Sequence, residues 1–332
     1  MQRIKDYSLK NNNTFGIDCR AAEFIEYDSV EELQALVPEL QGRSVLHVGG
    51  GSNLLFTKNF DGIVLHSRIR GIDIVDETAE DVLVRVGASE IWDEFVEYTV
   101  EHGWSGIENL SLIPGETGAA AVQNIGAYGC EVKDVIAEVE TVSLQTGERR
   151  LFSQSDCGYA YRQSIFKREL KGLYAVTHVK IRLSKTFKPN TGYGNIQQAM
   201  EDRELTAANV RQAIIDIRNA KLPDPKVTGN AGSFFVNPVV TAEKFHELQL
   251  QYPAMPFYEV NGGYKIPAGW LIEQAGWKGR SLGRAAVHDK QALVIVNLGG
   301  ADAAEIVRLS DTVRADVREK FGVEIKPEVN FI

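Results

Sequence analysis

The sequence of 332 residues has few cysteines, and their positions exclude two common structural devices. Cys19, Cys130 and Cys157 are odd in number and widely spaced, and none belongs to a C-x-x-C pair. The sequence therefore predicts neither a disulfide framework nor a zinc site, as is typical of a reducing compartment. The six histidines are also scattered without metal-ligand spacing, so we expect no bound metal.

The sequence also lacks an excess of positive charge and any long apolar run. Acidic residues outnumber basic ones by 45 to 36, and the net charge of −9 argues against a nucleic-acid surface. No stretch approaches the roughly 18 consecutive apolar residues of a membrane span, and the N-terminus has no apolar signal core. We therefore expect a cytoplasmic protein without a membrane partner. Its length predicts two or three domains.

One stretch of small residues is the most informative feature that is present. Residues 113–131 contain four glycines and four alanines and almost no bulky charge. Such a run offers little apolar surface to bury, but its N–H groups could form a surface that holds a diphosphate. The side-chain amides of Gln123 and Asn124 would suit the ring edge of a flavin or a nucleotide. The alternative is a glycine-rich connecting loop.

A second cluster of glycines favours the cofactor interpretation. Gly49-Gly50-Gly51-Ser52-Asn53 directly follows a short predicted strand, and consecutive glycines allow the positive φ angles of an anion-binding nest. The cluster lacks the G-x-G-x-x-G spacing of a dinucleotide fingerprint, and no G-x-x-x-x-G-K-S/T loop occurs in the chain. Two such clusters in one chain indicate a large cofactor that carries phosphate.

Hydrophobic periodicity and capping residues predict a mixture of helices and strands. We expect strands at 45–48, 62–66, 82–86, 139–144, 173–183 and 292–296, with a hairpin turn at 145–147. We expect helices at 30–37 capped by Ser29, at 91–100 capped by Ser89 and ended by Gly103, around Val210–Ile217, after Thr241, and from Ile306 to Phe321. The prolines of Leu222-Pro223-Asp224-Pro225 predict a linker.

The glycine clusters and four further motifs together resemble one family, the UDP-N-acetylenolpyruvylglucosamine reductases. The resemblance runs from Asn13-Thr14-Phe15-Gly16 to the C-terminus. Its blocks lie at 49–53, 106–108, 114–129, 161–164 (Tyr-Arg-Gln-Ser), 231–238 (Ala-Gly-Ser-Phe-Phe-Val-Asn-Pro) and 327–329 (Pro-Glu-Val). The loop 190–194 matches the longer subtype of the family, in which a tyrosine loop caps the UDP-sugar.

This resemblance implies an α+β fold of three domains. Two would form an FAD-binding unit of the vanillyl-alcohol-oxidase-like type, and the third would be a substrate-binding α+β domain. We expect the first FAD-binding subdomain at 1–68, the second at 69–221 joined by the tail 322–332, and the substrate domain at 222–321. We also expect a monomer.

The resemblance further implies NADPH-dependent reduction of an enolpyruvyl UDP-sugar through non-covalently bound FAD, with no metal. By this resemblance Arg162 faces the substrate carboxylate, Ser233 donates a proton to the substrate carbon, and Glu328 helps to stabilise or protonate the enolic intermediate. An alcohol is a weak acid, so a nearby cation must assist Ser233, and Lys221 is our candidate.

The remaining site residues follow from the same resemblance. The positions that match the FAD contacts of the family are Gly49, Gly50, Gly51, Ser52, Asn53, Leu54, Pro114, Gly115, Gly118, Ala119, Gln123, Asn124, Ile125, Gly126 and Tyr128. The positions that match its UDP-sugar contacts are Tyr193, Lys221, Asn237, Tyr258, Lys265 and Gln291.

Two other functions remain open from the residues alone. A flavin oxidase would share the cofactor site and could tether FAD through His47 or Cys130, but it would have no use for Ser233 or Glu328. A flavin-binding or UDP-sugar-binding regulator would have no use for Arg162 either. NADPH consumption that depends on the enolpyruvyl UDP-sugar distinguishes the reductase from both.

Overall fold

The computed structural model describes residues 1–193 and 195–332. The described chain forms two compact units. The first contains residues 1–7, 21–50 and 60–220, and the second contains residues 8–20, 51–59 and 221–332. The mixture of helices and strands in each unit confirms the predicted α+β class.

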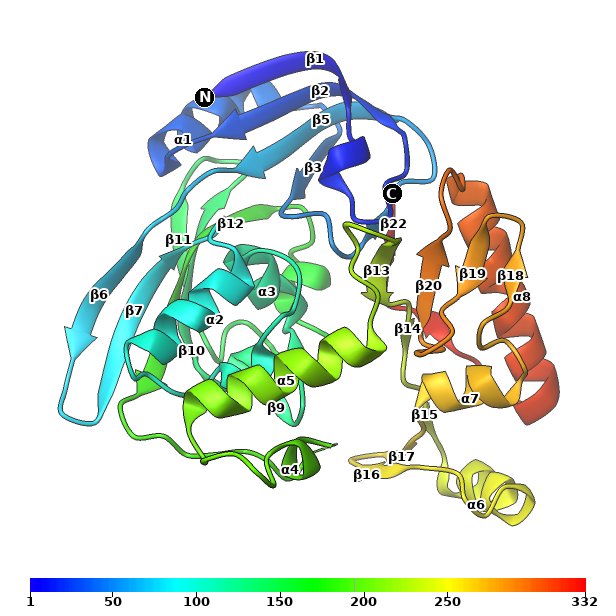
Figure 1. Ribbon diagram of the computed structural model, residues 1–332. Coiled ribbons are helices and arrows are strands. Elements are labelled where there is room, and N and C mark those ends of the chain that lie inside the picture. The colour runs from blue at the N-terminus through cyan, green and yellow to red at the C-terminus, as the bar shows by residue number, and fades with distance from the viewer. Residues whose placement is uncertain (194) are drawn as a thin grey trace. The chain divides into compact units, whose positions relative to one another are not determined.

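The first unit contains a partly parallel sheet and an antiparallel one (Figure 1). The order of the first sheet is β1-β2-β5-β3, from Gln2–Ser8, Arg20–Tyr27, Phe60–Ser67 and Val45–Val48. Both β2 and β3 are parallel to β5. The order of the second sheet is β11-β10-β12-β7-β6, from Arg149–Ser153, Ile136–Ser143, Tyr174–Ser184, Asp81–Gly87 and Ile72–Glu77.

Amphipathic helices cover one face of each sheet in this unit. Helix α1 (Val30–Leu40) packs Leu33, Leu36 and Leu40 against the first sheet. Helices α2 (Trp92–Glu101) and α3 (Thr117–Gln123) cover the second sheet. The unit also contains the short strands β8 (Gly126–Ala127) and β9 (Cys130–Glu131), α4 (Ile196–Ala199) and most of α5 (Ala207–Lys221).

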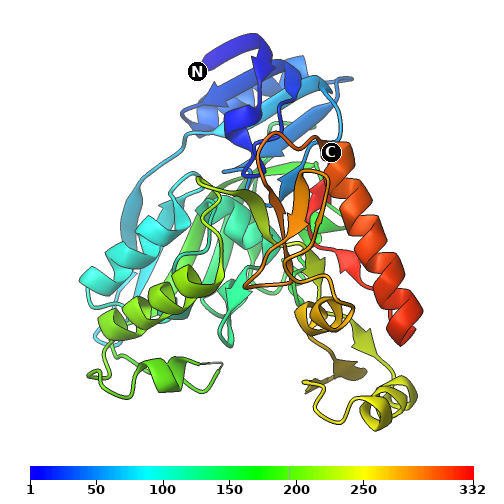
Figure 2. The same cartoon turned by 45° about the vertical axis from the view of Figure 1, so that its right-hand side comes forward.

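The second unit is built around a small sheet and the long helix α8 (Ala303–Phe321), drawn in red in Figure 2. The sheet order is β13-β20-β19-β18, from Gly229–Ser233, Val294–Asn297, Ala285–Val287 and Ser281–Leu282. Short pairs and triplets of strands complete it: β14 (Phe235–Val236) with β21 (Lys326–Pro327), β4 (Leu54–Leu55) with β22 (Asn330–Phe331), and β15-β17-β16 (Val239–Val240, Gly263–Lys265, Tyr258–Val260). Helices α6 (Ala242–Gln251) and α7 (Ala268–Gln274) pack into the same core.

Most predicted elements are confirmed, and one cap was wrong. The Ser29 and Thr241 side chains accept from the N–H groups of Glu32 and Lys244, as N-caps do. Ser89 does not cap α2, which begins at Trp92. The Ser89 hydroxyl instead donates to the carbonyl of Ile69 at 2.8 Å. A buried hydroxyl needs a hydrogen-bond partner, and for Ser89 that partner is the carbonyl of Ile69, in the segment between β5 and β6.

The boundaries of the two compact units can be compared with the predicted domain borders. The last boundary falls between residues 220 and 221, where α5 ends before the predicted proline linker. The tail 322–332 belongs to the second unit through the pairs β14–β21 and β4–β22. The three functional domains at 1–68, 69–221 and 222–321 stay a prediction.

Candidate active site

The two small-residue loops of the first unit lie directly against each other. A Cβ atom on Gly49 would lie 3.0 Å from Glu116 Oε2 and 3.2 Å from the Cβ of Ala119. A Cβ atom on Gly50 would lie 3.5 Å from the Cα of Gly115. Side chains at these positions would fill the approach between the loops. The glycine backbone at 49 and 50 thus lies against the side chains of Glu116 and Ala119 and the main chain of Gly115, and the predicted phosphate-bearing cofactor surface stays a prediction.

The second loop is held in place by the segment that follows strand β7 of the second sheet. The N–H of Gly118 donates to the Ala88 carbonyl at 2.9 Å, and a Cβ on Gly118 would lie only 2.8 Å from the Cβ of Ala88. The Thr117 N–H donates to the Glu90 carbonyl. Glycine at 118 is thus required for a close backbone approach, which fixes the loop against a rigid element.

The other half of the first glycine cluster belongs to the second unit. Gly51 has a φ of +66°, and a Cβ there would lie 2.0 Å from the Asn12 carbonyl oxygen. The Thr14 N–H donates to the Gly51 carbonyl at 3.1 Å. Ser52 and Asn53 follow, and Leu54 enters β4, which pairs with the C-terminal strand β22. Only glycine can occupy position 51.

Two of the three predicted catalytic residues are brought together within the second unit. The Glu328 N–H donates to the carbonyl of Phe234, the residue after Ser233, at 2.8 Å. The Asn53 side chain donates to the Glu328 carbonyl at 3.4 Å. Ser233 follows Gly232, whose φ is +68°, and its side chain is exposed at the end of β13. Hydrogen bonds to the Glu328 backbone therefore link the segment after Ser233 with the end of the glycine cluster.

Arg162 lies in the first unit, in a strained turn. Its φ is +55°, which is rare for a side chain of this size, and the backbone groups of Ala160 and Gln163 close the turn with two hydrogen bonds. Its guanidinium donates to the carbonyls of Gly126 at 2.6 Å and Asn124 at 3.4 Å. Strain of this kind persists where the surrounding structure fixes it, most often at functional sites.

Asn124 supports this arrangement through its side chain. It is fully buried in a left-handed conformation at the C-cap of α3. Its amide donates to the Ala160 carbonyl at 2.8 Å and to Glu131, and its oxygen accepts from the Lys133 N–H. The amide that the sequence offered as a flavin contact is thus engaged with protein, and the Asn124 carbonyl accepts from Arg162.

The other predicted cofactor positions of this unit surround the same loops. Gly126 needs to be glycine because a Cβ would lie 2.8 Å from the Cys130 carbonyl and 3.0 Å from Arg162 Nη1. Ile125 packs at the edge of the core, and Gln123 is half-buried at the end of α3. Pro114 immediately precedes the close approach at Gly115.

The predicted tyrosine loop lies beside the second small-residue loop. A Cβ on Gly129 would lie 3.4 Å from the Cβ of Tyr193. The buried Asn109 amide links the two segments by donating to the carbonyls of Tyr128 and Asn190, at 3.0 and 2.8 Å. The Tyr193 side chain is 40% exposed, so its ring is available at the surface. Gly194, part of the predicted loop, lies outside the described residues.

The predicted UDP contacts of the second unit form two pairs. The Asn237 side chain accepts from the Ala268 N–H at 2.9 Å, and a Cβ on Gly269 would lie 3.1 Å from Gln291 Oε1, so both amides lie at the start of α7. Tyr258 and Lys265 are cross-strand partners in β16 and β17, with the ammonium 5.5 Å from the ring centroid. The sixth contact, Lys221, is the exposed last residue of α5.

Arg218 is a residue that sequence reasoning missed. Its Nε is buried with no hydrogen-bond partner among the described residues. Burial lowers the pKa of Arg218, the nearby Tyr128 and Asp93 oppose that shift, and the positive charge of Arg162 adds to it. Two neighbouring guanidinium groups in an acidic protein indicate a site for an anion. The i,i+3 spacing to Lys221 on α5 was the only signal in the sequence.

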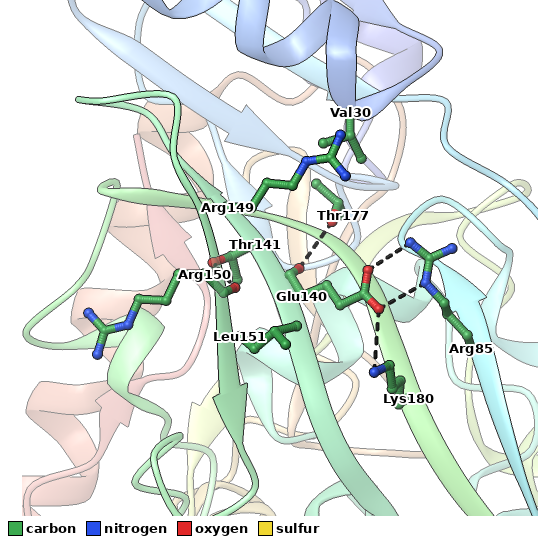
Figure 3. Close-up of a pocket in the computed structure, with 9 residues that line it drawn as sticks. All are labelled: Val30, Arg85, Glu140, Thr141, Arg149, Arg150, Leu151, Thr177 and Lys180. Atoms are coloured by element: carbon green, nitrogen blue, oxygen red, sulfur yellow. Dashed lines mark hydrogen bonds and ion pairs between the residues drawn. The ribbon is translucent and has the colours of Figure 1, made fainter. Parts of the chain in front are cut away.

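A recess of about 370 Å³ on the outer face of the second sheet is a different kind of feature (Figure 3). Its charged groups are already paired with protein. Arg85 makes two bonds of 2.8 and 2.7 Å to Glu140, and Lys180 Nζ lies 3.8 Å from the same carboxylate. None of the predicted site residues lines it. The recess is a salt-bridged surface and not the candidate site.

The two residues considered for flavin tethering have other partners. The Tyr27 hydroxyl lies 2.7 Å from His47 Nε2, and burial, followed by the charge of His66, lowers the pKa of His47 to about 4. The Asn190 amide lies 3.3 Å from Cys130 Sγ, and burial raises the pKa of that thiol. A raised pKa keeps the thiol protonated and poorly nucleophilic.

Across residues 1–193 and 195–332, no helix is both long and apolar enough to span a bilayer.

Comparison with known proteins agrees with these features. Residues 21–152 match a family model described as an FAD binding domain. Residues 224–332 match the model of the C-terminal domain of UDP-N-acetylenolpyruvoylglucosamine reductase.

Relatives with that name match the whole chain. The reductase of Bacteroides fragilis is 57% identical over 98% of this chain and 99% of its own length, and that of Porphyromonas gingivalis is 46% identical over 99% and 98%. The crystal structure of the reductase from Thermus caldophilus has the same fold, with a TM-score of 0.70 at 22% identity over 99% of this chain and 98% of its own. The chain belongs to the UDP-N-acetylenolpyruvoylglucosamine reductase family.

Proposed function

We propose that the protein reduces UDP-N-acetyl-3-O-(1-carboxyvinyl)-glucosamine to UDP-N-acetylmuramate, with NADPH as reductant and FAD as cofactor, in peptidoglycan precursor synthesis. The observation that carries this proposal is the 57% identity to a reductase of that name over 98% of the chain. The match of residues 21–152 to an FAD binding domain supports the cofactor.

The residues of the two small-residue loops fit a bound FAD. Gly49 and Gly50 lack the Cβ that would meet Glu116, Ala119 and Gly115, and glycine backbone of this kind can hold a diphosphate through N–H groups. When bound, FAD supplies hydride chemistry, accepting hydride from NADPH and delivering it to the enolpyruvyl group. The protein binds it without a covalent tether, because His47 is engaged by Tyr27 and the Cys130 thiol stays protonated.

The first unit contributes positive charge to substrate binding. Arg162 binds the substrate carboxylate through its fork of N–H groups and stabilises the negative charge that develops beside it. Main-chain carbonyls hold this guanidinium at 2.6 and 3.4 Å, so its orientation is set before substrate arrives. Arg218 adds a second charge beside it, and its buried Nε has no hydrogen-bond partner among the described residues.

The second unit contributes the proton. Ser233 Oγ gives its proton to the substrate carbon next to the carboxylate, and a cation, for which Lys221 is the candidate, stabilises the alkoxide that remains. Glu328, bonded through its N–H to the Phe234 carbonyl, stabilises or protonates the enolic form. General acid catalysis by a positioned side chain is worth about 10²- to 10⁴-fold.

The nucleotide part of the substrate is held by six residues. Lys221 and Lys265 neutralise the diphosphate, the amides of Asn237 and Gln291 bind polar edges, and the rings of Tyr193 and Tyr258 pack on the nucleotide. Two lysines are notable in a protein of net charge −9, because a diphosphate needs positive charge that the whole molecule does not provide.

We further propose that the protein works in the cytoplasm as a monomer, without a nucleic-acid or membrane partner. The FAD-binding subdomains are 1–68 and 69–221 with the tail 322–332, and the substrate domain is 222–321. A sedimentation measurement of the holoprotein tests the monomer.

The deciding experiment follows NADPH absorbance with purified protein. Oxidation that requires UDP-N-acetylenolpyruvylglucosamine, with one product per NADPH, is expected. The proposal is contradicted if the rate of NADPH oxidation does not depend on the UDP-sugar. It is also contradicted if the purified protein takes up no FAD. Denaturation supplies a second test, since yellow colour that stays with the unfolded chain would indicate a tethered flavin and an oxidase.

A further inference from the structure

His66 lies at the carboxyl end of the parallel part of the first sheet. In the registers of β2, β5 and β3, His66 is directly opposite Glu26 on one side and Val48 on the other. The residue after Val48 is Gly49, where the first small-residue loop begins. Ligands of open parallel sheets bind beyond the carboxyl ends of the strands. His66 is thus one residue from the proposed cofactor surface.

The imidazole of His66 joins two carboxylates from different segments. Its Nδ1 lies 2.9 Å from Glu26 Oε1, and its Nε2 lies 3.0 Å from Glu116 Oε1. All three side chains are largely buried, at 17%, 20% and 13% exposure for His66, Glu26 and Glu116. The second oxygen of Glu116 is the atom that lies against Gly49. The ring therefore connects the strand edge to the contact between the two loops.

The geometry favours a protonated ring. An ionised carboxylate can only accept a hydrogen bond, so two carboxylate partners call for N–H on both nitrogens. Burial alone lowers the pKa of His66, but the bonds and charges of Glu116 and Glu26 outweigh it, and the net pKa is raised.

The neighbouring elements supply few other charges to this cluster. Arg68 Nη1 lies 3.7 Å from Glu26 Oε2, whereas His47 on β3 is neutral near pH 7 because its pKa is lowered to about 4. The buried Tyr27 phenol on β2 is also neutral, since burial raises its pKa. Arg68 Nε lies closer to Asp28 Oδ1, at 3.1 Å, so the arginine charge is shared between Glu26 and Asp28. Loss of the His66 proton therefore adds one negative charge beside Glu116.

We propose that His66 is a positioning residue for FAD: as an imidazolium it fixes Glu116 against Gly49 and neutralises it, so that retention of the flavin depends on its protonation. This inference rests on the proposed function, because the diphosphate of FAD is the group that an unneutralised Glu116 would repel. An unneutralised Glu116 carboxylate repels the like charge of the FAD diphosphate. Because solvent screens part of this repulsion, we expect it to weaken FAD binding about tenfold.

The direction of the pH dependence follows from the raised pKa. The stabilising charge is fully present below the ordinary histidine value of about 6.5 and is lost as pH rises through the higher pKa of the folded protein. Affinity for FAD is therefore expected to be high at pH 6.5 and about tenfold lower at pH 9.

The test titrates FAD into flavin-free protein between pH 6 and 9 and follows quenching of flavin fluorescence. The affinity of the wild-type protein for FAD should fall as pH rises, with the dependence expected for loss of a single proton. Glu116→Gln, which keeps the shape and removes the charge, should bind equally well at both ends of the range. His66→Gln should bind weakly throughout. His102→Gln is the matched control, because this exposed histidine of α2's C-terminus should keep the wild-type profile.

A second measurement does not depend on FAD or on a folded His66 variant. In the flavin-free protein, NMR of labelled imidazoles should show His66 doubly protonated at pH 7, with its pKa lowered in Glu116→Gln. A flat wild-type profile, an unchanged slope in Glu116→Gln, or a neutral His66 ring at pH 6.5 would each overturn the inference alone. Absence of FAD uptake at every pH would overturn the proposed function with it.

Discussion

The two units hold their site residues in different ways. In the first unit, the functional side chains are themselves bonded: Arg162 to main-chain carbonyls, Asn124 to three groups, and Glu116 to His66. In the second unit, the two proposed catalytic residues are positioned through their backbones. Glu328 is placed through its N–H, and Ser233 through strand pairing with Val294.

This difference separates positioning from chemistry. A change of a bonded side chain in the first unit should alter affinity or stability, because its partners lose hydrogen bonds in a buried setting. A change of the Ser233 or Glu328 side chain in the second unit should alter a reaction step and leave the fold intact. Four experiments test this distinction between the units.

The largest effect is expected for Ser233→Ala. Loss of the proton donor should slow reoxidation of the flavin by substrate about a thousandfold. Reduction of the flavin by NADPH and the melting temperature should be unchanged, since the Ser233 hydroxyl is exposed and its backbone pairing remains. Stopped-flow flavin absorbance measures the two half-reactions separately. Normal turnover would rule out the role, and a large drop in melting temperature would break the distinction between the units.

The next effect concerns backbone placement at Gly51. The methyl group of Gly51→Ala would meet the Asn12 carbonyl oxygen at 2.0 Å in a left-handed conformation, which should cost about 3 kcal/mol of unfolding free energy or more. Gly16→Ala is the control in the same unit. Gly16 has a φ of +65° but no atom within 4 Å, so only the strain of about 1–2 kcal/mol applies. Urea unfolding of both variants gives the comparison, and equal losses would contradict it.

Arg218→Met tests the buried guanidinium of the first unit. Loss of a charged anchor should raise KM for the UDP-sugar about thirtyfold, which corresponds to about 2 kcal/mol. The melting temperature should change little, because the lost bond to Tyr128 is offset by removal of a buried Nε that has no hydrogen-bond partner among the described residues. The surface variant Arg203→Met, which loses only its pair with Asp216, is the control. A lower melting temperature with unchanged KM would assign Arg218 a purely structural role.

The last test concerns a difference in acid stability. His47 and His178 of the first unit both have a pKa lowered to about 4, the former by burial and the charge of His66, the latter by burial and the charge of Arg85. A lowered folded pKa gives stability that is complete above about 6.5 and lost as pH falls toward 4, at up to about 1.4 kcal/mol per pH unit for each group. Fluorescence of Trp92 and Trp104 should therefore change at higher pH than that of Trp270 and Trp277 in paired Trp→Phe variants. Coincident transitions would contradict this.

Much of the fold could be predicted because its signals are local. The caps at Ser29 and Thr241, the strand at 45–48 and the long C-terminal helix all follow from residues within a few positions of one another, and all are confirmed. The Ser89 cap was wrong because a distant carbonyl, that of Ile69, took the hydroxyl.

The features of the site also separate into those that follow from local sequence and those that depend on tertiary contacts. The motifs, the positions of the small-residue loops and the family could be predicted from the residues alone, since these depend on residue type and order. Only the tertiary structure decided that Asn12 requires glycine at 51, that Arg218 lies buried near Arg162, and that His66 bridges Glu26 and Glu116. Burial, steric contact and charge pairing join segments tens of residues apart, and no local pattern encodes their distance.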